Sequence, residues 1–159
     1  MAVSTNIAGQ LKSFKTVYWA MAVSQVILGT ACYVLISTGM LGKPDYSLAL
    51  MLQKVALILI PSMMALGYFL FKYQLSRLDP KLPLDDKLKR YLALVLVRGA
   101  LFEFAFLFCC VAALVTNVLL FLWIAPVVFF VFLLLRPVPE GIATDLQLSQ
   151  ADSNKLTKA

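Results

Sequence analysis

The sequence contains no histidine, so the side chain most often used as a metal ligand and neutral-pH proton carrier is absent. Charged residues make up only 14% of the 159 residues, against about 25% in soluble domains. The three cysteines, Cys32, Cys109 and Cys110, lie inside apolar runs without a CxxC spacing. Cysteines of this kind usually act as small buried apolar residues. These scarcities argue against a soluble domain, a disulfide scaffold and a metal centre, and we expect neither metal nor cofactor.

Hydrophobic residues, in contrast, make up 62% of the chain and gather in four long runs. The runs cover about 17–38, 48–71, 91–115 and 118–135. Each is close to the roughly 20 residues that a helix needs to cross the hydrocarbon of a bilayer. Backbone groups have no water partner there, so each span must be helical. The sequence therefore predicts an all-α fold, an integral membrane four-helix bundle with antiparallel up-down topology.

The domain organisation that follows is simple. Residues 1–136 form one four-transmembrane-helix domain, and residues 137–159 form a cytoplasmic tail. Pro137 and Pro139 end the fourth helix, because proline lacks the N–H that a helix needs. The last ten residues are small and polar, and we expect them to be disordered.

The distribution of lysine and arginine predicts the orientation. Eleven of the 14 lie in the N-terminal flank, in residues 72–90 or after the fourth span, which all share one side of the membrane. Lys43 alone lies on the other side. The positive-inside rule then predicts an N-in/C-in topology, with both termini and the loop of residues 72–90 in the cytoplasm. With a net charge of +6, the basic loop favours anionic lipid headgroups rather than nucleic acid.

Three charged residues lie within the spans, where ionisable side chains are costly and raise a functional question. Lys54 and Arg98 lie about 9 and 10 Å from their nearest ends, and both side chains are long enough to snorkel to the interface. Glu103 lies near the midplane and is too short to reach either surface. Its carboxyl group must therefore be protonated, paired or directed into a polar cavity.

Several partners for these residues are consistent with the sequence. Lys54 on the second span reaches Glu103 only with strain, and Gln25 on the first span lies at a depth that allows a hydrogen bond to Arg98. Pro61 and Pro126 lie in the midplane layer and free one backbone carbonyl each, those of Leu57 and Leu122. These carbonyls beside Glu103 would form a small polar core. Three interpretations of Glu103 stay open: a neutral carboxyl group without a transport role, a protonatable site in a conduction or binding path, and a contact with a partner protein.

The tail carries one resemblance. The residues that match are Pro137, Glu140, Ile142, Asp145, Leu146 and Leu148. This run resembles the ending of small, uncharacterised four-span inner-membrane proteins from Bacteroidota-type bacteria. The resemblance covers the last tenth of the chain together with the hydropathy profile. It implies a bacterial inner membrane and carries over neither a reaction nor a site.

No P-loop, GxSxG, H-E-x-x-H or GxGxxG motif is present in the sequence. Our leading hypothesis is therefore a non-catalytic accessory subunit, assembly factor or membrane scaffold that binds a membrane protein partner or a second copy of itself. The alternative is a small proton-coupled transporter or channel that uses Glu103. An intramembrane enzyme acting on lipid is a third hypothesis, with only Asp79, Asp85 and Asp86 as candidate polar residues.

Overall fold

The computed structural model describes residues 2–79, 82–146, 148 and 150. Over these residues every regular element is helical, which confirms the all-α prediction. Residues 151–159, for which the sequence predicts disorder, lie outside the described residues. The helices are α1 (Ala2–Ser37), α2 (Tyr46–Ser76), α3 (Leu84–Thr116), α4 (Leu120–Leu134) and α5 (Pro139–Asp145).

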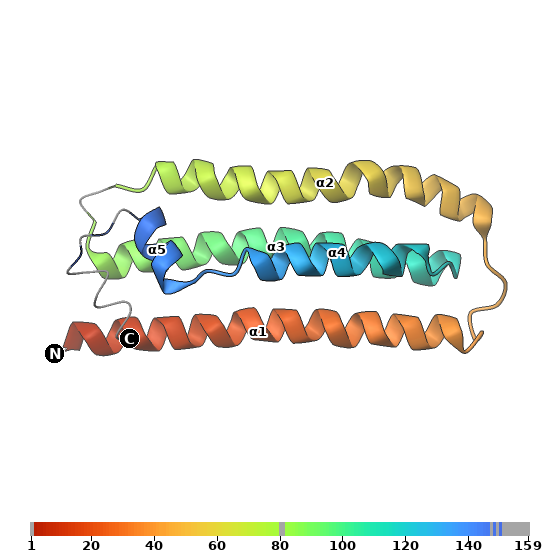
Figure 1. Ribbon diagram of the computed structural model, residues 1–159, viewed down its shortest axis with the longest axis horizontal. Helices are drawn as coiled ribbons and strands as arrows, with labels where there is room; N and C mark the ends of the chain where they lie inside the picture. Colours follow the sequence, from red (N-terminus) through yellow and green to blue (C-terminus); the bar gives the residue numbers. More distant parts are fainter. Residues whose placement is uncertain (1, 80–81, 147, 149, 151–159) are drawn as a thin grey trace.

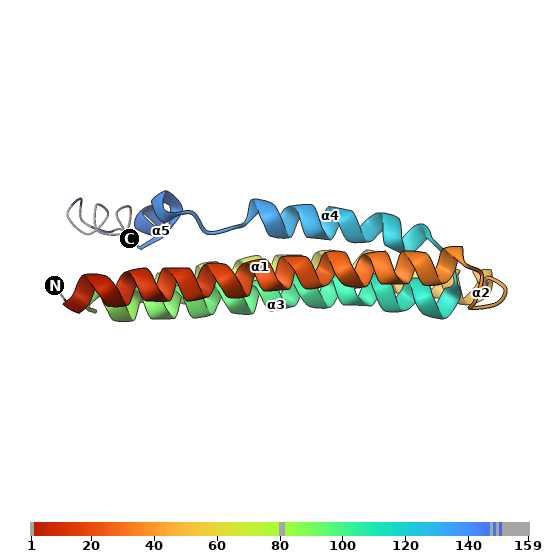
Figure 2. The same ribbon diagram turned by 90° about the horizontal axis from the view of Figure 1, so that it is seen from below.

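Helix α3 is the centre of the arrangement. It packs against α1, α2 and α4, whereas α1 and α2 barely touch each other. Helices α2, α3 and α1 lie side by side in one layer, and α4 and α5 cover one face of that layer (Figures 1 and 2). The chain reverses its direction at each connection between the first four helices (Figure 1). The first four helices thus pack around α3, with α4 on one face of the layer, an arrangement consistent with a four-helix bundle.

The buried face of α3 explains this central position. Ala105, Cys109 and Ala113 recur at every fourth residue and are fully buried. Small residues at this spacing lie on one face of a helix and allow neighbouring helices to approach closely. Phe102 and Phe106 fill the space beside them. All three cysteines are buried and free, as the sequence predicts.

The connection between α1 and α2 is set by glycine and by a capping aspartate. Gly39 and Gly42 have φ angles of +69° and +86°, which residues with a Cβ adopt only with strain. The carboxylate of Asp45 accepts a hydrogen bond of 3.0 Å from the backbone N–H of Leu48 and so caps α2. This bond, together with one from the Ser47 hydroxyl, holds the pKa of Asp45 below its ordinary value.

The turn between α3 and α4 is tied to that first connection. Asn117 ends α3 in the left-handed region at φ 53°, and its side-chain amide donates a 2.6 Å hydrogen bond to the carbonyl of Gly42. The backbone N–H of Asp45 donates to the carbonyl of Thr116 at 2.9 Å. Two connections far apart in sequence are therefore fixed to each other at one end of the molecule.

Three helices are long and apolar enough to cross a membrane among the described residues: Gly9–Ser37, Tyr46–Ser76 and Leu84–Thr116. The fourth differs from the prediction. A span over 118–135 was expected, but α4 has only 15 residues and is about 22 Å long. That is less than the roughly 30 Å of hydrocarbon in a bilayer. Residues 135–138 and α5 follow α4 along the same face of the layer, where a longer fourth helix would lie (Figure 2).

Asn117 provides a test of the turn. Replacing it with alanine removes the bond to Gly42 and places a Cβ without compensation at positive φ, so we expect the free energy of unfolding to fall by about 2 kcal/mol. Asn117→Gly removes the same bond without the conformational penalty and should lose about half as much. Equilibrium unfolding of both variants in mixed micelles would measure this, and equal losses would contradict the conformational argument.

Candidate functional site

The most unusual feature of the backbone is the break after α4. The helix ends at Leu134, and α5 begins only at Pro139. The last carbonyls of a helix lack partners within the helix and need other donors when they are buried. A positive charge is favourable at this end, because the helix dipole is negative there. The chain supplies both requirements from side chains of α1 and α3.

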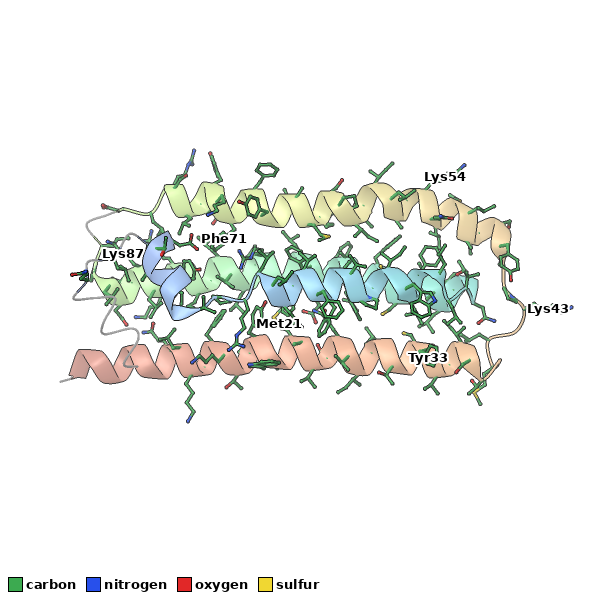
Figure 3. All side chains as sticks on the ribbon, viewed as in Figure 1. Met21, Tyr33, Lys43, Lys54, Phe71 and Lys87 are labelled. Carbon is green, nitrogen blue, oxygen red and sulfur yellow. The ribbon has the colours of Figure 1, made fainter. Side chains whose placement is uncertain are left out.

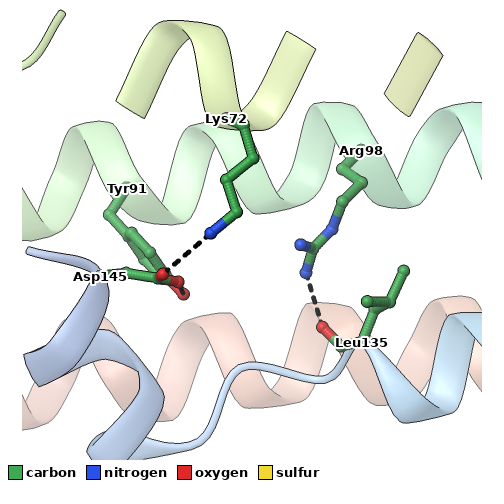
Figure 4. Close-up of polar contacts among 5 residues, drawn as sticks. All are labelled: Lys72, Tyr91, Arg98, Leu135 and Asp145. Carbon is green, nitrogen blue, oxygen red and sulfur yellow. Dashed lines mark hydrogen bonds and ion pairs between the residues drawn. The ribbon is translucent and has the colours of Figure 1, made fainter. Parts of the chain in front are cut away.

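Arg98 of α3 satisfies the end of α4 directly. Its Nη2 atom donates a hydrogen bond of 2.6 Å to the carbonyl of Leu135 (Figure 4). The residue is only 8% exposed, and its guanidinium carbon lies 4.3 Å from the centre of the Phe71 ring. The contact with Phe71 is a cation–π interaction, which is strongest where water is excluded. Arg98 is thus held between α2 and the end of α4.

Tyr18 of α1 provides a second donor. Its hydroxyl group donates a hydrogen bond of 2.5 Å to the carbonyl of Phe132, in the last turn of α4. The two rings stack with their centres 4.5 Å apart and an angle of 7° between their planes. Tyr18 is 4% exposed, so the whole ring contributes apolar packing as well as the bond.

Helix α5 is fixed by an acidic residue at its end. Asp145 accepts a hydrogen bond of 3.1 Å from the Tyr91 hydroxyl and forms an ion pair of 3.5 Å with Lys72 (Figure 4). Ile142 and Leu146 are buried beneath the helix. We refer to Tyr18, Lys72, Tyr91, Arg98 and Asp145 as the helix-break cluster. It draws residues from α1, α2, α3 and α5 around the break, and its donors are directed at backbone carbonyls or at Asp145.

In this cluster Arg98 has other partners than Gln25, the one that the sequence suggested. Arg98 is not bonded to Gln25, because its guanidinium group is held by Leu135 and Phe71. Gln25 is 2% exposed, and within the described part of the chain neither of its amide atoms has a hydrogen-bond partner. It faces α4 near Pro126, roughly one helical turn beyond the level of Arg98.

Glu103 and Lys54 are also separated. Lys54 is exposed on α2 and points away from α3 (Figure 3). Glu103 is half-buried and turns the other way, toward α1, where the Ser24 hydroxyl lies 3.3 Å from its Oε1 atom. The same hydroxyl lies 2.8 Å from the carbonyl of Met21. Because serine has a single hydroxyl proton, Ser24 donates either to the carbonyl of Met21 or to Oε1 of Glu103.

Sequence reasoning missed four members of the cluster. From the sequence, Tyr18 and Tyr91 look like tyrosines of the membrane–water interface. Lys72 and Asp145 look like water-exposed charged residues near the end of a span. The sequence contains one signal that could have indicated the cluster. An arginine lies inside an apolar run, and the last apolar run is short and ends just before two prolines. A helix that ends early leaves carbonyls that long donors such as arginine and tyrosine can reach.

Comparisons with protein-family models, with curated proteins and with solved structures find no match to this chain. The resemblance of the tail to small bacterial four-span proteins therefore stays a prediction.

Arg98→Leu tests the helix-break cluster. The variant leaves the carbonyl of Leu135 without its charged donor, so we expect the free energy of unfolding to fall by about 2–3 kcal/mol. Amide hydrogen exchange over residues 135–146 should accelerate more than exchange in α2. Unfolding in mixed micelles and exchange measured by mass spectrometry give the two readouts.

Arg77→Leu is the matched control. Arg77 also lies 4.3 Å from an aromatic ring centre, that of Tyr73, but it is exposed. Its loss should cost no more than about 1 kcal/mol. Equal effects of the two arginine variants would show that the bond to Leu135 contributes nothing.

Proposed function

We propose that the protein is a multi-pass integral membrane protein of a bacterial plasma membrane, with both termini in the cytoplasm. Three helices of sufficient length and apolar character support the insertion. Many large apolar side chains are exposed along them, among them Ile27, Leu57, Ile58 and Phe69. Lipid is the natural environment for such surfaces, since soluble monomers rarely expose contiguous apolar areas of this kind.

In this proposal the fourth crossing is made by α4, the break and α5 together. Irregular backbone at membrane depth is tolerated only where protein satisfies its polar groups. The bonds from Arg98 to Leu135 and from Tyr18 to Phe132 supply that condition. The short α4 is therefore compatible with a chain that returns to the cytoplasmic side.

The orientation is testable by cysteine labelling in bacterial cells. Lys43→Cys should react with a membrane-impermeant maleimide in intact cells, whereas Gln74→Cys should react only after permeabilisation. The unchanged chain is the background control, because its own three cysteines are buried. Labelling of both positions from the same side would contradict the proposed topology.

We propose that the protein acts as a non-catalytic accessory subunit or scaffold that binds a partner within the membrane. Glu103 carries this proposal. It lies in a half-exposed position at the seam of α1 and α3, beside the exposed Ser24, and among exposed apolar residues such as Val23 and Phe104. A carboxyl group exposed to lipid at this depth is unfavourable. A polar contact from a second membrane helix would remove the penalty.

The proton-coupled transporter is less well supported by the same geometry. A transporting carboxyl group needs access to water, and the cleft between α1 and α4 does not include Glu103. Two other polar side chains of the spans, Arg98 and Tyr18, donate to backbone carbonyls rather than to a mobile species. The polar residues of the spans thus favour a role in assembly.

Glu103→Leu tests the accessory role. We expect the protein extracted from its native membrane in mild detergent to migrate as a larger complex, and the variant to shift toward the free chain. The ratio of complex to free chain should fall about three- to thirtyfold, as a contact between membrane helices is worth about 0.6–2 kcal/mol. Native gel electrophoresis measures that ratio.

Glu103→Gln provides the control, because it keeps the shape of the side chain and an oxygen that accepts a hydrogen bond. It should retain the complex. A wild-type protein that migrates as the free chain would contradict the accessory role, and a proton flux in liposomes that Glu103→Gln abolishes would favour the transporter.

A further inference from the structure

A groove of about 330 Å³ lies between the end of α2 and the first turns of α3. It is lined by two arginines and four uncharged residues: Arg77, Arg90, Gln74, Leu78, Ala93 and Leu94. None of them belongs to α4 or α5, and both arginines are exposed. Small-molecule sites begin at about this volume. We refer to this open feature as the two-arginine groove.

Arg77 is held in place at one wall of the groove. Its backbone N–H donates to the carbonyls of Gln74 and Leu75 and so closes the end of α2. Its guanidinium carbon lies 4.3 Å from the centre of the ring of Tyr73, which is exposed. A guanidinium group that stacks on a ring through its face keeps the N–H groups of its edge for an acceptor. Arg77 therefore presents hydrogen-bond donors at the groove.

Neither arginine of the groove is neutralised by a carboxylate. Within the described part of the chain, the ion pairs involve Lys72 and Lys89, and neither Arg77 nor Arg90 takes part in one. Asp86 lies one turn before Arg90, but it forms its ion pair with Lys89, at 4.0 Å. All lining residues of the groove are described, and none of them is acidic. The groove thus carries two positive charges without a counter-charge.

A second hollow, beside α5, has a different balance of charge. It has a volume of about 530 Å³ and is lined by two lysines and two aspartates, Lys72, Lys87, Asp79 and Asp145. Its positive and negative charges cancel, and Lys72 is already paired with Asp145 at 3.5 Å. Charge complementarity therefore favours an anion in the two-arginine groove and not in this hollow.

An apolar strip continues from the groove along α3. Leu94, Val97, Leu101 and Phe104 follow Arg90 at alternating intervals of four and three residues, so all five lie on one face of the helix. Val97 and Phe104 are about half exposed. The strip leads from the arginines toward the middle of α3, which is the direction of the bilayer centre in the proposed membrane insertion.

These features together indicate the chemistry of an occupant. Phosphate oxygens match the N–H groups of guanidinium in pairs. The acyl chains of a phospholipid suit the apolar strip, whereas a free phosphate ion would leave the strip uncovered. Basic pockets between membrane helices on the cytoplasmic side bind anionic headgroups. A zwitterionic headgroup such as phosphocholine brings a positive charge of its own, which the two arginines repel.

We propose that the two-arginine groove binds one anionic phospholipid. The phosphate accepts hydrogen bonds from Arg77 and Arg90, and the acyl chains lie along the strip that contains Val97 and Phe104. This site rests on the proposed membrane insertion and is independent of the proposed partner and of Glu103. It goes beyond a general attraction of anionic lipids to the basic loop, because it requires these two arginines and the apolar strip.

Native mass spectrometry of the purified full-length protein in mild detergent tests the proposal. Phosphatidylglycerol and phosphatidylcholine with the same acyl chains are added in separate samples at equal concentration, and the fraction of protein with one bound lipid is measured. Phosphatidylglycerol should bind about 25-fold more tightly, since each cation near an anionic headgroup contributes about a factor of five.

Substitutions assign this preference to the groove. Arg77→Gln and Arg90→Gln should each reduce it about fivefold, and the double variant should abolish it. The single variants carry the test should the double variant fail to fold. Lys12→Gln combined with Arg136→Gln is the matched control, because it removes two charges from exposed residues outside the groove. Arg136 also lies over an aromatic ring, 5.4 Å from the centre of Trp19. This control should keep the preference.

Two further arms test the source of the phosphate and the shape of the groove. Inorganic phosphate in large excess should leave phosphatidylglycerol bound, because it has no acyl chains. Ala93→Phe fills the groove without removing a charge and should weaken the binding of phosphatidylglycerol. Circular dichroism confirms that each variant keeps its helices.

Equal binding of the two lipids by the unchanged protein would overturn the proposal, as would a preference that survives both arginine substitutions. An equal loss in the Lys12 and Arg136 control would reduce the effect to a general attraction and overturn the assigned site. Displacement by inorganic phosphate would assign the groove to a soluble anion instead. Glu103→Leu should keep the lipid preference even where it dissociates the complex, which separates this proposal from the accessory role. The cysteine labelling described above tests the insertion independently.

Discussion

The hydrogen bond from Arg98 to the carbonyl of Leu135 is the contact on which the C-terminal part of the fold depends. It allows α4 to stop after 15 residues without leaving a buried carbonyl unpaired at its end. The chain can then continue without helical structure to α5, where Asp145 is held by Tyr91 and Lys72. Without such a donor, the fourth apolar segment would have to continue as a helix to keep its backbone groups paired.

Four of the polar side chains within the apolar helices form two groups. Arg98 and Tyr18 are used inside the molecule, since both donate to carbonyls at the end of α4. Gln25 and Glu103 are not used in this way: Gln25 has no partner among the described residues, and Glu103 faces only the hydroxyl of Ser24. Polar side chains without such partners lower the stability of the fold unless a molecule outside the chain forms hydrogen bonds with them. For that reason the proposed accessory role rests on Glu103.

The candidate sites show how far sequence reasoning extends. It identified Lys54, Arg98 and Glu103 as unusual, because charge within an apolar run is visible without a structure. It did not find their partners, because contacts between helices depend on how each helix is rotated about its axis. The sequence predicts similar depths for Gln25 and Arg98, yet Arg98 bonds to Leu135 and Gln25 has no partner among the described residues. Lys54 and Glu103 lie on opposite sides of α3.

The sequence by itself determined the helical class and the approximate limits of the long apolar helices, since both follow from local composition and the turn residues between the runs. Only the tertiary structure decided that α3 is central, that α4 is short and that a side chain of another helix closes its end. The reason is physical. Helix formation is a property of neighbouring residues, whereas the end of a buried helix is set by whichever donors the rest of the fold brings to it.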